Sequence, residues 1–70
     1  MNEEQIELFL MINEPTFEFN GKEYSVWCPG DGFTTSDSDG NEEEFTDIHD
    51  LLENWKLCGL PFKFVVQTII

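Results

Sequence analysis

The sequence has no arginine and only three lysines, Lys22, Lys56 and Lys63, against 15 acidic residues. Its formal net charge is -12. Proteins that bind DNA or RNA neutralise phosphates with lysine and arginine, so this composition excludes direct binding of nucleic acid. It also argues against docking on an anionic membrane, which attracts basic segments.

Long apolar runs are missing as well. The longest, Leu8 to Ile12, is far shorter than the roughly 20 residues that a membrane-spanning helix needs. The first residues are acidic, whereas a secretory signal begins with a basic segment. We therefore expect a cytoplasmic protein without a membrane partner. The 70 residues (1–70) have room for a single small domain but not for a large catalytic cleft.

Histidine and cysteine are too scarce to indicate catalysis or a metal centre. The chain has His49, Cys28 and Cys58, but no C-x-x-C pair and no nucleophile motif linked to the histidine. We expect both thiols to stay reduced and to behave as small buried hydrophobic groups. His49 is expected to pair with Glu53, four residues later on a helix. We therefore predict no enzymatic activity, no cofactor and no metal site.

Apolar residues are plentiful enough for a folded domain. Hydrophobic residues make up 40% of the chain and aromatic residues 14%, and disordered chains are poor in both. The clearest local pattern is in residues 16–28, where two β-prone segments flank Asn20-Gly21. This pair is the preferred one for a two-residue hairpin turn, so we predict a β-hairpin.

The hairpin turn also fixes which side chains share a face. Phe17 is predicted to lie opposite Tyr24, with its neighbours alternating between the two faces. Trp27 falls on the face opposite the core together with Glu18 and Glu23, so it is either covered by another element or exposed among acidic and polar neighbours. The predicted core face comprises Phe17, Phe19, Tyr24, Val26 and Cys28.

A helix is predicted over residues 3–13. Its first turn is acidic, which the positive end of the helix dipole favours, and Pro15 follows it. The alternating apolar residues from Ile6 to Ile12 also fit a strand, so the strand remains the alternative.

A second helix is predicted to start after Thr46 as N-cap and to end before Gly59. Leu57 projects from the opposite side of this helix and needs cover from the C-terminal segment or from a partner. The core stripe of the helix is predicted to comprise Ile48, Leu51, Leu52 and Trp55.

The remaining segments complete a small sheet. Residues 33–36 are predicted to form a third strand, and residues 42–45 a brief extended stretch. Residues 61–70 are rich in aromatic and β-branched residues, which favours a final strand, although Pro61 and the apolar spacing after it also fit a helix. The predicted fold class is α+β: a three-stranded antiparallel meander with the Asn20-Gly21 hairpin, one or two helices on one face, and a C-terminal strand.

Acidic residues concentrate in the middle of the chain, where residues 31–53 hold nine of the fifteen. An acidic surface steers a protein toward basic partners. We therefore predict a non-enzymatic interaction module that docks on a basic partner protein. If that partner binds nucleic acid, the carboxylates would act as a nucleic-acid mimic in its groove. The candidate partner-binding residues are Glu42, Glu43, Glu44, Asp37, Asp39 and Trp27.

Residues 37–42 resemble part of a calcium-binding loop. Thr35 and Thr46 stand where such a loop needs carboxylates, so the pattern is better explained by an Asp-Gly turn. A weak divalent-cation site among these crowded carboxylates is the alternative.

The alternative function is a small structural or accessory domain that associates through apolar surface at Trp27 and the C-terminal segment. In that case the acidic residues serve only solubility. The sequence leaves the partner's identity and the oligomeric state open.

The net charge predicts how stability responds to salt. Repulsion among the excess carboxylates opposes the compact state, so added salt, or acidification to about pH 5–6, should raise the melting temperature. Thermal unfolding in a series of NaCl concentrations measures this, and a melting temperature that falls with salt would contradict the prediction.

Overall fold

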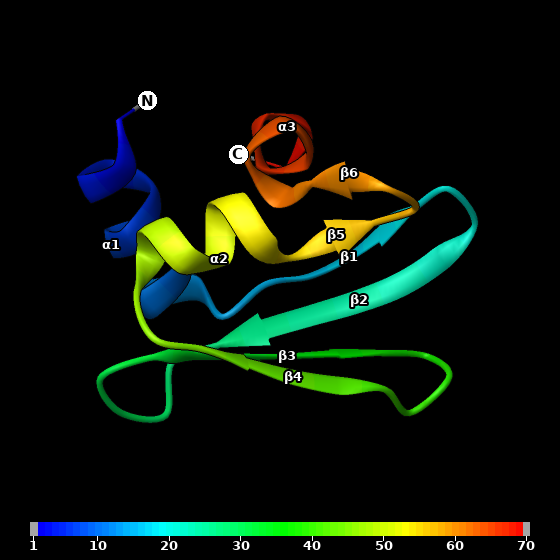
Figure 1. Ribbon diagram of the computed structural model, residues 1–70, viewed down its shortest axis with the longest axis horizontal. Coiled ribbons are helices and arrows are strands. Elements are labelled where there is room, and N and C mark those ends of the chain that lie inside the picture. The colour runs from blue at the N-terminus through cyan, green and yellow to red at the C-terminus, as the bar shows by residue number, and fades with distance from the viewer. Residues whose placement is uncertain (1, 70) are drawn as a thin grey trace.

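The computed structural model describes residues 2–69, which form two layers. One layer is an antiparallel sheet of four strands in the order β1-β2-β3-β4. The helices and a small two-stranded sheet lie together on one side of it (Figure 1). The elements are α1 (Glu3–Asn13), β1 (Thr16–Phe19), β2 (Lys22–Trp27), β3 (Phe33–Asp37), β4 (Glu42–Phe45), α2 (Ile48–Asn54), β5 (Lys56–Leu57), β6 (Leu60–Pro61), α3 (Phe62–Val65) and the 3-10 helix η1 (Val66–Thr68).

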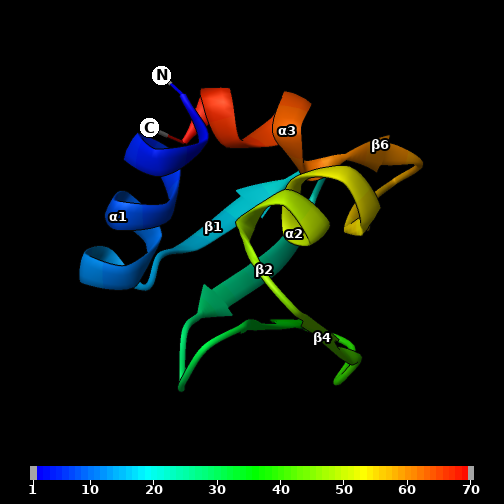
Figure 2. The same cartoon turned by 60° about the vertical axis from the view of Figure 1, so that its left-hand side comes forward.

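The predicted α+β class is confirmed, and the meander has one strand more than predicted. The extended stretch at residues 42–45 is β4, which pairs with β3 along its whole length. Figure 2 shows the layers from a second direction, with α2 crossing above the sheet. Within residues 2–69, no helix is long and apolar enough to cross a membrane.

The first helix is confirmed over the strand alternative. Asn2 caps it by accepting a hydrogen bond from the Gln5 backbone, while the Gln5 side chain accepts one from the Asn2 backbone. This reciprocal cap satisfies two of the free N–H groups at the helix start. Ile6 and Leu10 bury one side of α1 in the core.

The hairpin of β1 and β2 has the predicted register, with Phe17 opposite Tyr24. Asn20 and Gly21 both adopt positive φ, at 55° and 81°, as a two-residue hairpin turn of this type requires. The predicted core face is also confirmed. Phe17, Tyr24 and Val26 are buried, and Phe19 and Cys28 pack against the core at its margin.

The second helix begins one residue later than predicted. Asp47 is the N-cap, because its side chain accepts a hydrogen bond from the Asp50 backbone at 2.8 Å. Thr46 instead donates its backbone N–H and its hydroxyl to the Asp50 carboxylate. Ile48, Leu51 and Leu52 are buried as predicted, and Trp55, the residue after the helix, is 3% exposed.

The C-terminal end of this helix was predicted wrongly. Gly59 does not follow the helix but forms, with Cys58, the positive-φ turn between β5 and β6. Leu57 therefore lies in a strand and is fully buried. Cys58 is exposed in this turn and not buried as predicted, whereas Cys28 is partly buried; both thiols are free.

The predicted strand over residues 61–70 is wrong for residues 62–69, and Ile70 lies outside the described residues. β6 ends at Pro61, and α3 and η1 follow. Phe62, Val65 and Val66 are spaced for one face of a helix, and all three are buried. A strand would have turned Val65 and Val66 to opposite faces, so burial of both favours the helix.

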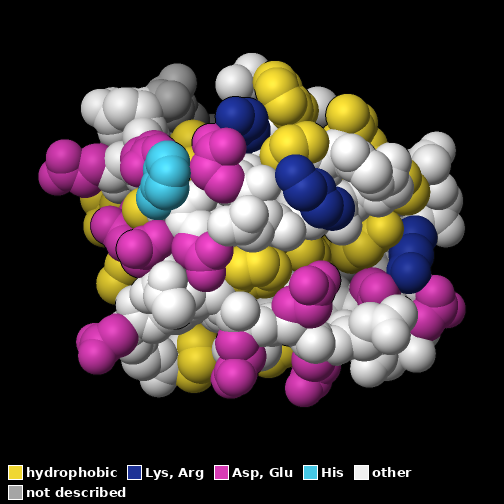
Figure 3. Space-filling model, in the orientation of Figure 1, with side chains coloured by type: hydrophobic (Ala, Val, Ile, Leu, Met, Phe, Trp, Pro, Cys, Tyr) yellow, Lys and Arg dark blue, Asp and Glu magenta, His cyan; other side chains and the backbone are white. Residues whose placement is uncertain are grey.

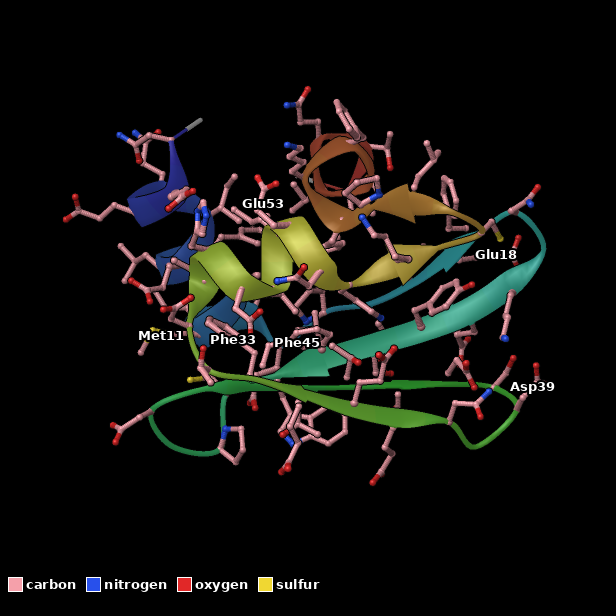
Figure 4. All side chains as sticks on the ribbon, viewed as in Figure 1. Met11, Glu18, Phe33, Asp39, Phe45 and Glu53 are labelled. Atoms are coloured by element: carbon pink, nitrogen blue, oxygen red, sulfur yellow. The ribbon has the colours of Figure 1, made fainter. Side chains whose placement is uncertain are left out.

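An aromatic cluster joins the two layers. Phe17 and Tyr24 contribute from the sheet, and Trp55 and Phe62 from the helical layer. The rings of Trp55 and Phe62 have centroids 4.6 Å apart, and those of Phe17 and Phe62 are stacked at 6.0 Å. Phe33 and Phe45 extend the core under α2, as Figure 4 shows.

Phe62 and Phe64 provide a matched test of the C-terminal helix. Phe62 is fully buried, so Phe62→Ala should lower the free energy of unfolding by about 3–5 kcal/mol. Phe64 is 57% exposed, so Phe64→Ala should change it by less than about 0.5 kcal/mol. Urea unfolding of both variants measures the difference, and equal losses would rule out this packing of the segment.

An ion pair connects the two longest helices. His49 on α2 lies 3.0 Å from the Glu3 carboxylate on α1, and not against Glu53 as predicted. The hydrogen bond and the charge of Glu3 raise the pKa of His49 above its ordinary value of 6.5. Because folding raises this pKa, the pair stabilises the fold fully below pH 6.5, and this contribution is lost as the pH rises through the folded pKa.

We therefore expect His49 to contribute to the pH dependence of stability. The difference in melting temperature between about pH 6 and about pH 8 should be smaller for His49→Gln than for the wild type. Glu3→Gln should have the same effect, and the double variant no further one. An undiminished difference in His49→Gln would show that the general repulsion of carboxylates accounts for it alone.

Candidate functional site

The side of the sheet that faces away from the helices is the candidate site. Side chains alternate between the two faces of a strand, and the cross-strand registers align the faces of all four strands. No described helix packs on this side (Figures 1 and 2). We call it the open face, and it comprises Thr16, Glu18, Glu23, Ser25, Trp27, Thr34, Ser36, Glu42 and Glu44.

Hydroxyl groups occupy the centre of the open face. Ser25 lies opposite Thr16 on one side and Ser36 on the other, and the Thr16 and Ser25 hydroxyls are 3.0 Å apart. These side chains are small and polar, whereas the larger tryptophan and glutamate side chains occupy the neighbouring positions of the face.

Trp27 is the only aromatic residue among those of the open face. It lies opposite Thr34, which in turn lies opposite Glu44, so these three residues form one row across β2, β3 and β4. Trp27 is half-buried, and no described helix packs on its side of the sheet, which answers the question that the sequence left open. The exposed part of an indole can offer an apolar ring surface to a partner.

The three consecutive glutamates of β4 do not form one cluster. Glu42 and Glu44 are on the open face, opposite Ser36 and Thr34. Glu43 lies opposite Thr35, which is buried on the helical side, so its side chain leaves from the other face. All three are exposed. The strand therefore separates residues that the sequence presents together.

Glu18 and Glu23, which the predicted hairpin register places on the same face as Trp27, add a second acidic edge. They face each other directly across β1 and β2. Like charges in this position destabilise a sheet, and no lysine among residues 2–69 lies beside them on the open face. Their alternation with the buried Phe17 and Tyr24 was the signal that placed them together.

Asp37 and Asp39, in contrast, are engaged within the protein. Lys22 Nζ lies 3.2 Å from the Asp37 carboxylate and 2.8 Å from that of Asp39. Partial burial raises the pKa of Asp37, but hydrogen bonds from Asn41, Lys22 and the Asp39 backbone outweigh it and lower the pKa to about 2. The two carboxylates in turn raise the pKa of Lys22 above its usual 10.5.

These contacts explain the segment that resembles a calcium loop. Asp37 accepts hydrogen bonds from the Asp39 and Asn41 backbones and so closes the turn between β3 and β4. Gly40 in this turn has a φ of 89°. No group of three or more potential metal ligands occurs among residues 2–69.

A cleft of about 370 Å³ adjoins the open face. The loop from Pro29 to Gly32 and residues of β3 and β4, among them Thr34 and Glu44, line this cleft. Gly32 allows this arrangement, because a β-carbon there would collide with the Phe45 carbonyl oxygen. The cleft could not be predicted from the sequence, since the loop carries no recognisable motif.

The lysines are distributed unlike the carboxylates. Lys63 pairs with Glu53 at 3.0 Å, and Lys56 donates to the Glu53 backbone carbonyl at 3.2 Å. Both belong to the helical side of the molecule, and Lys22 is held by Asp37 and Asp39. Figure 3 shows acidic side chains along the half of the surface that covers β3 and β4.

Comparison with protein-family models, with characterised proteins and with solved structures finds no match for this chain. The open face is therefore the main basis for inferring a function.

Proposed function

We propose that the protein is a non-enzymatic interaction module whose open face docks on a basic partner protein. One observation carries this proposal: an uncovered sheet face holds four carboxylates and a half-buried tryptophan, and none of its described residues is cationic. Solubility alone requires charge, but it does not require the sheet to accept two glutamates directly opposite each other. A partner's cations would relieve that repulsion.

The row formed by Trp27, Thr34 and Glu44 suits an arginine side chain. Trp27 and Glu44 are two strand spacings apart, which is about 10 Å. A guanidinium group stacks on indole rings and forms paired hydrogen bonds with carboxylates. An arginine lying on Trp27, with a second cation at Glu44, would use both ends of this row.

The cleft beside the row supports a basic ligand as well. Glu44 and Asp31 both line it, and no lysine does. A long cationic side chain could place its carbon chain against Pro29 and its charge near these carboxylates. The open face and the cleft thus offer one continuous surface of the same sign.

A nucleic-acid-binding protein is the partner that this surface suits best. Glu42 and Glu44 are two residues apart on one strand face, which separates their Cα atoms by about 7 Å. Two exposed carboxylates on one strand present the negative charge that a phosphate-binding groove attracts. The proposed mode is competition with DNA or RNA for that groove.

The second candidate function is association through apolar surface. The observation that favours it is the exposure of Leu60, at 46%, and of Phe64, at 57%, in the C-terminal segment. Together with Trp27, these residues could contact a partner without help from the carboxylates. That association would be insensitive to salt, which separates it from docking on a basic protein.

The alternation of β4 provides the decisive test. Glu42→Gln, Glu43→Gln and Glu44→Gln each remove one charge from adjacent residues, but only the first and third change the open face. We expect the first and third to weaken partner binding by about three- to tenfold and Glu43→Gln to have a much smaller effect. Trp27→Ala should weaken binding by at least about tenfold.

The partner is first captured from a lysate of the source organism at low salt and identified by mass spectrometry. Its affinity for each purified variant is then measured across a salt series, with and without competing DNA. Equal effects of the three glutamate variants would contradict docking by the open face. Binding that salt leaves unchanged, and that Leu60→Gln or Phe64→Gln abolishes, would support the second candidate instead.

A further inference from the structure

The first helix buries only one of its sides. Ile6 and Leu10 point into the core, whereas Leu8 is 59%, Met11 50% and Ile12 70% exposed. These three residues are spaced i, i+3 and i+4, so they form one stripe along the outward side of α1. Figure 4 shows Met11 pointing away from the body of the molecule. Exposed apolar side chains that lie together, unlike single scattered ones, mark interaction sites.

Carboxylates border this stripe. Glu4 and Glu7 precede Leu8 and Met11 by one helical turn, and Glu14 follows the end of the helix. Within residues 2–69, none of these three carboxylates forms an ion pair with a lysine or with the histidine. The border of the stripe is therefore negative and uncompensated by the chain itself.

Glu14 is an unusual residue for its position. It ends α1 in the left-handed region, with a φ of 43°, where glycine or asparagine is the usual choice. Its carboxylate also lies at the negative end of the helix dipole, which favours a cation. Both the positive φ and the carboxylate at this end of the helix are unfavourable. A cation supplied by a partner would offset the unfavourable charge.

We propose that the outward face of α1, made of Leu8, Met11 and Ile12 with their border of Glu4, Glu7 and Glu14, binds a basic amphipathic helix of a partner protein. Three apolar side chains at helical spacing match the apolar stripe of a second helix. The acidic border selects lysine and arginine beside that stripe. A second copy of this chain would bring the same carboxylates against one another, so the charge disfavours it.

This inference does not rest on the open face, because α1 lies in the other layer of the fold. The probe is a synthetic peptide of about 18 residues, long enough to form a helix, with leucines on one face and lysines on the other. A scrambled peptide of identical composition has the same charge but no apolar face. The full chain is titrated with each peptide, and backbone and methyl NMR signals report the site.

We expect the helical peptide to shift the signals of Leu8, Met11 and Ile12 and to bind at least about tenfold more tightly than the scrambled peptide. Leu8→Gln/Ile12→Gln should weaken binding by at least about tenfold with an unchanged melting temperature, since both side chains are exposed. The matched control is Leu60→Gln/Phe64→Gln, which removes exposed apolar groups elsewhere and should leave binding unchanged. Glu14→Gln should weaken binding more than Glu18→Gln, which removes the same charge from the open face.

Three results would overturn the inference. Equal affinity for the scrambled peptide would show attraction by charge alone. Loss of binding in Glu42→Gln/Glu44→Gln, but not in Leu8→Gln/Ile12→Gln, would place the peptide on the open face and would leave the proposed function intact. Sedimentation that detects a dimer, lost in Leu8→Gln/Ile12→Gln, would make a second copy the occupant.

Discussion

The packing of Phe62 against Trp55 and Phe17 is the interaction on which the rest of the fold depends. It attaches the C-terminal helix to the sheet and also fixes the end of α2, since the Phe62 backbone N–H donates to the Trp55 carbonyl at 2.8 Å. A chain of 70 residues has little apolar surface to bury, so a few large rings carry much of the stability. All the described helices pack on the side of the sheet that carries these rings, so the other side is left uncovered.

Local rules were sufficient wherever a segment decides its own structure. Asn20 and Gly21 determine the hairpin turn, and the turn determines the register, so the faces of β1 and β2 follow from the order of the residues alone. The same alternation placed Trp27, Glu18 and Glu23 together. The first helix could be predicted because its acidic start and Pro15 agree with the helical spacing.

Prediction failed where distant contacts decide. The apolar spacing after Pro61 fits both a strand and a helix, and burial against Trp55 selects the helix. β5 and β6 have two residues each, which is too short for any alternation to be recognised. The pair of His49 and Glu3 joins residues far apart in sequence. For the candidate site, the register between β3 and β4 was needed before Glu44 could be placed in one row with Trp27, and before Glu43 could be separated from it.

β4 is an edge strand of the sheet, and its three glutamates affect how that edge meets another molecule. An edge strand presents unpaired backbone N–H and C=O groups, which can pair with an edge of another molecule and extend the sheet into an aggregate. Here, a second copy approaching along β4 would bring three glutamates from each chain into contact. Glu42 and Glu44 extend to one face of the sheet and Glu43 to the other, so the charge repulsion acts on both faces of this edge. The glutamates therefore protect the β4 edge of the sheet from pairing with a second copy.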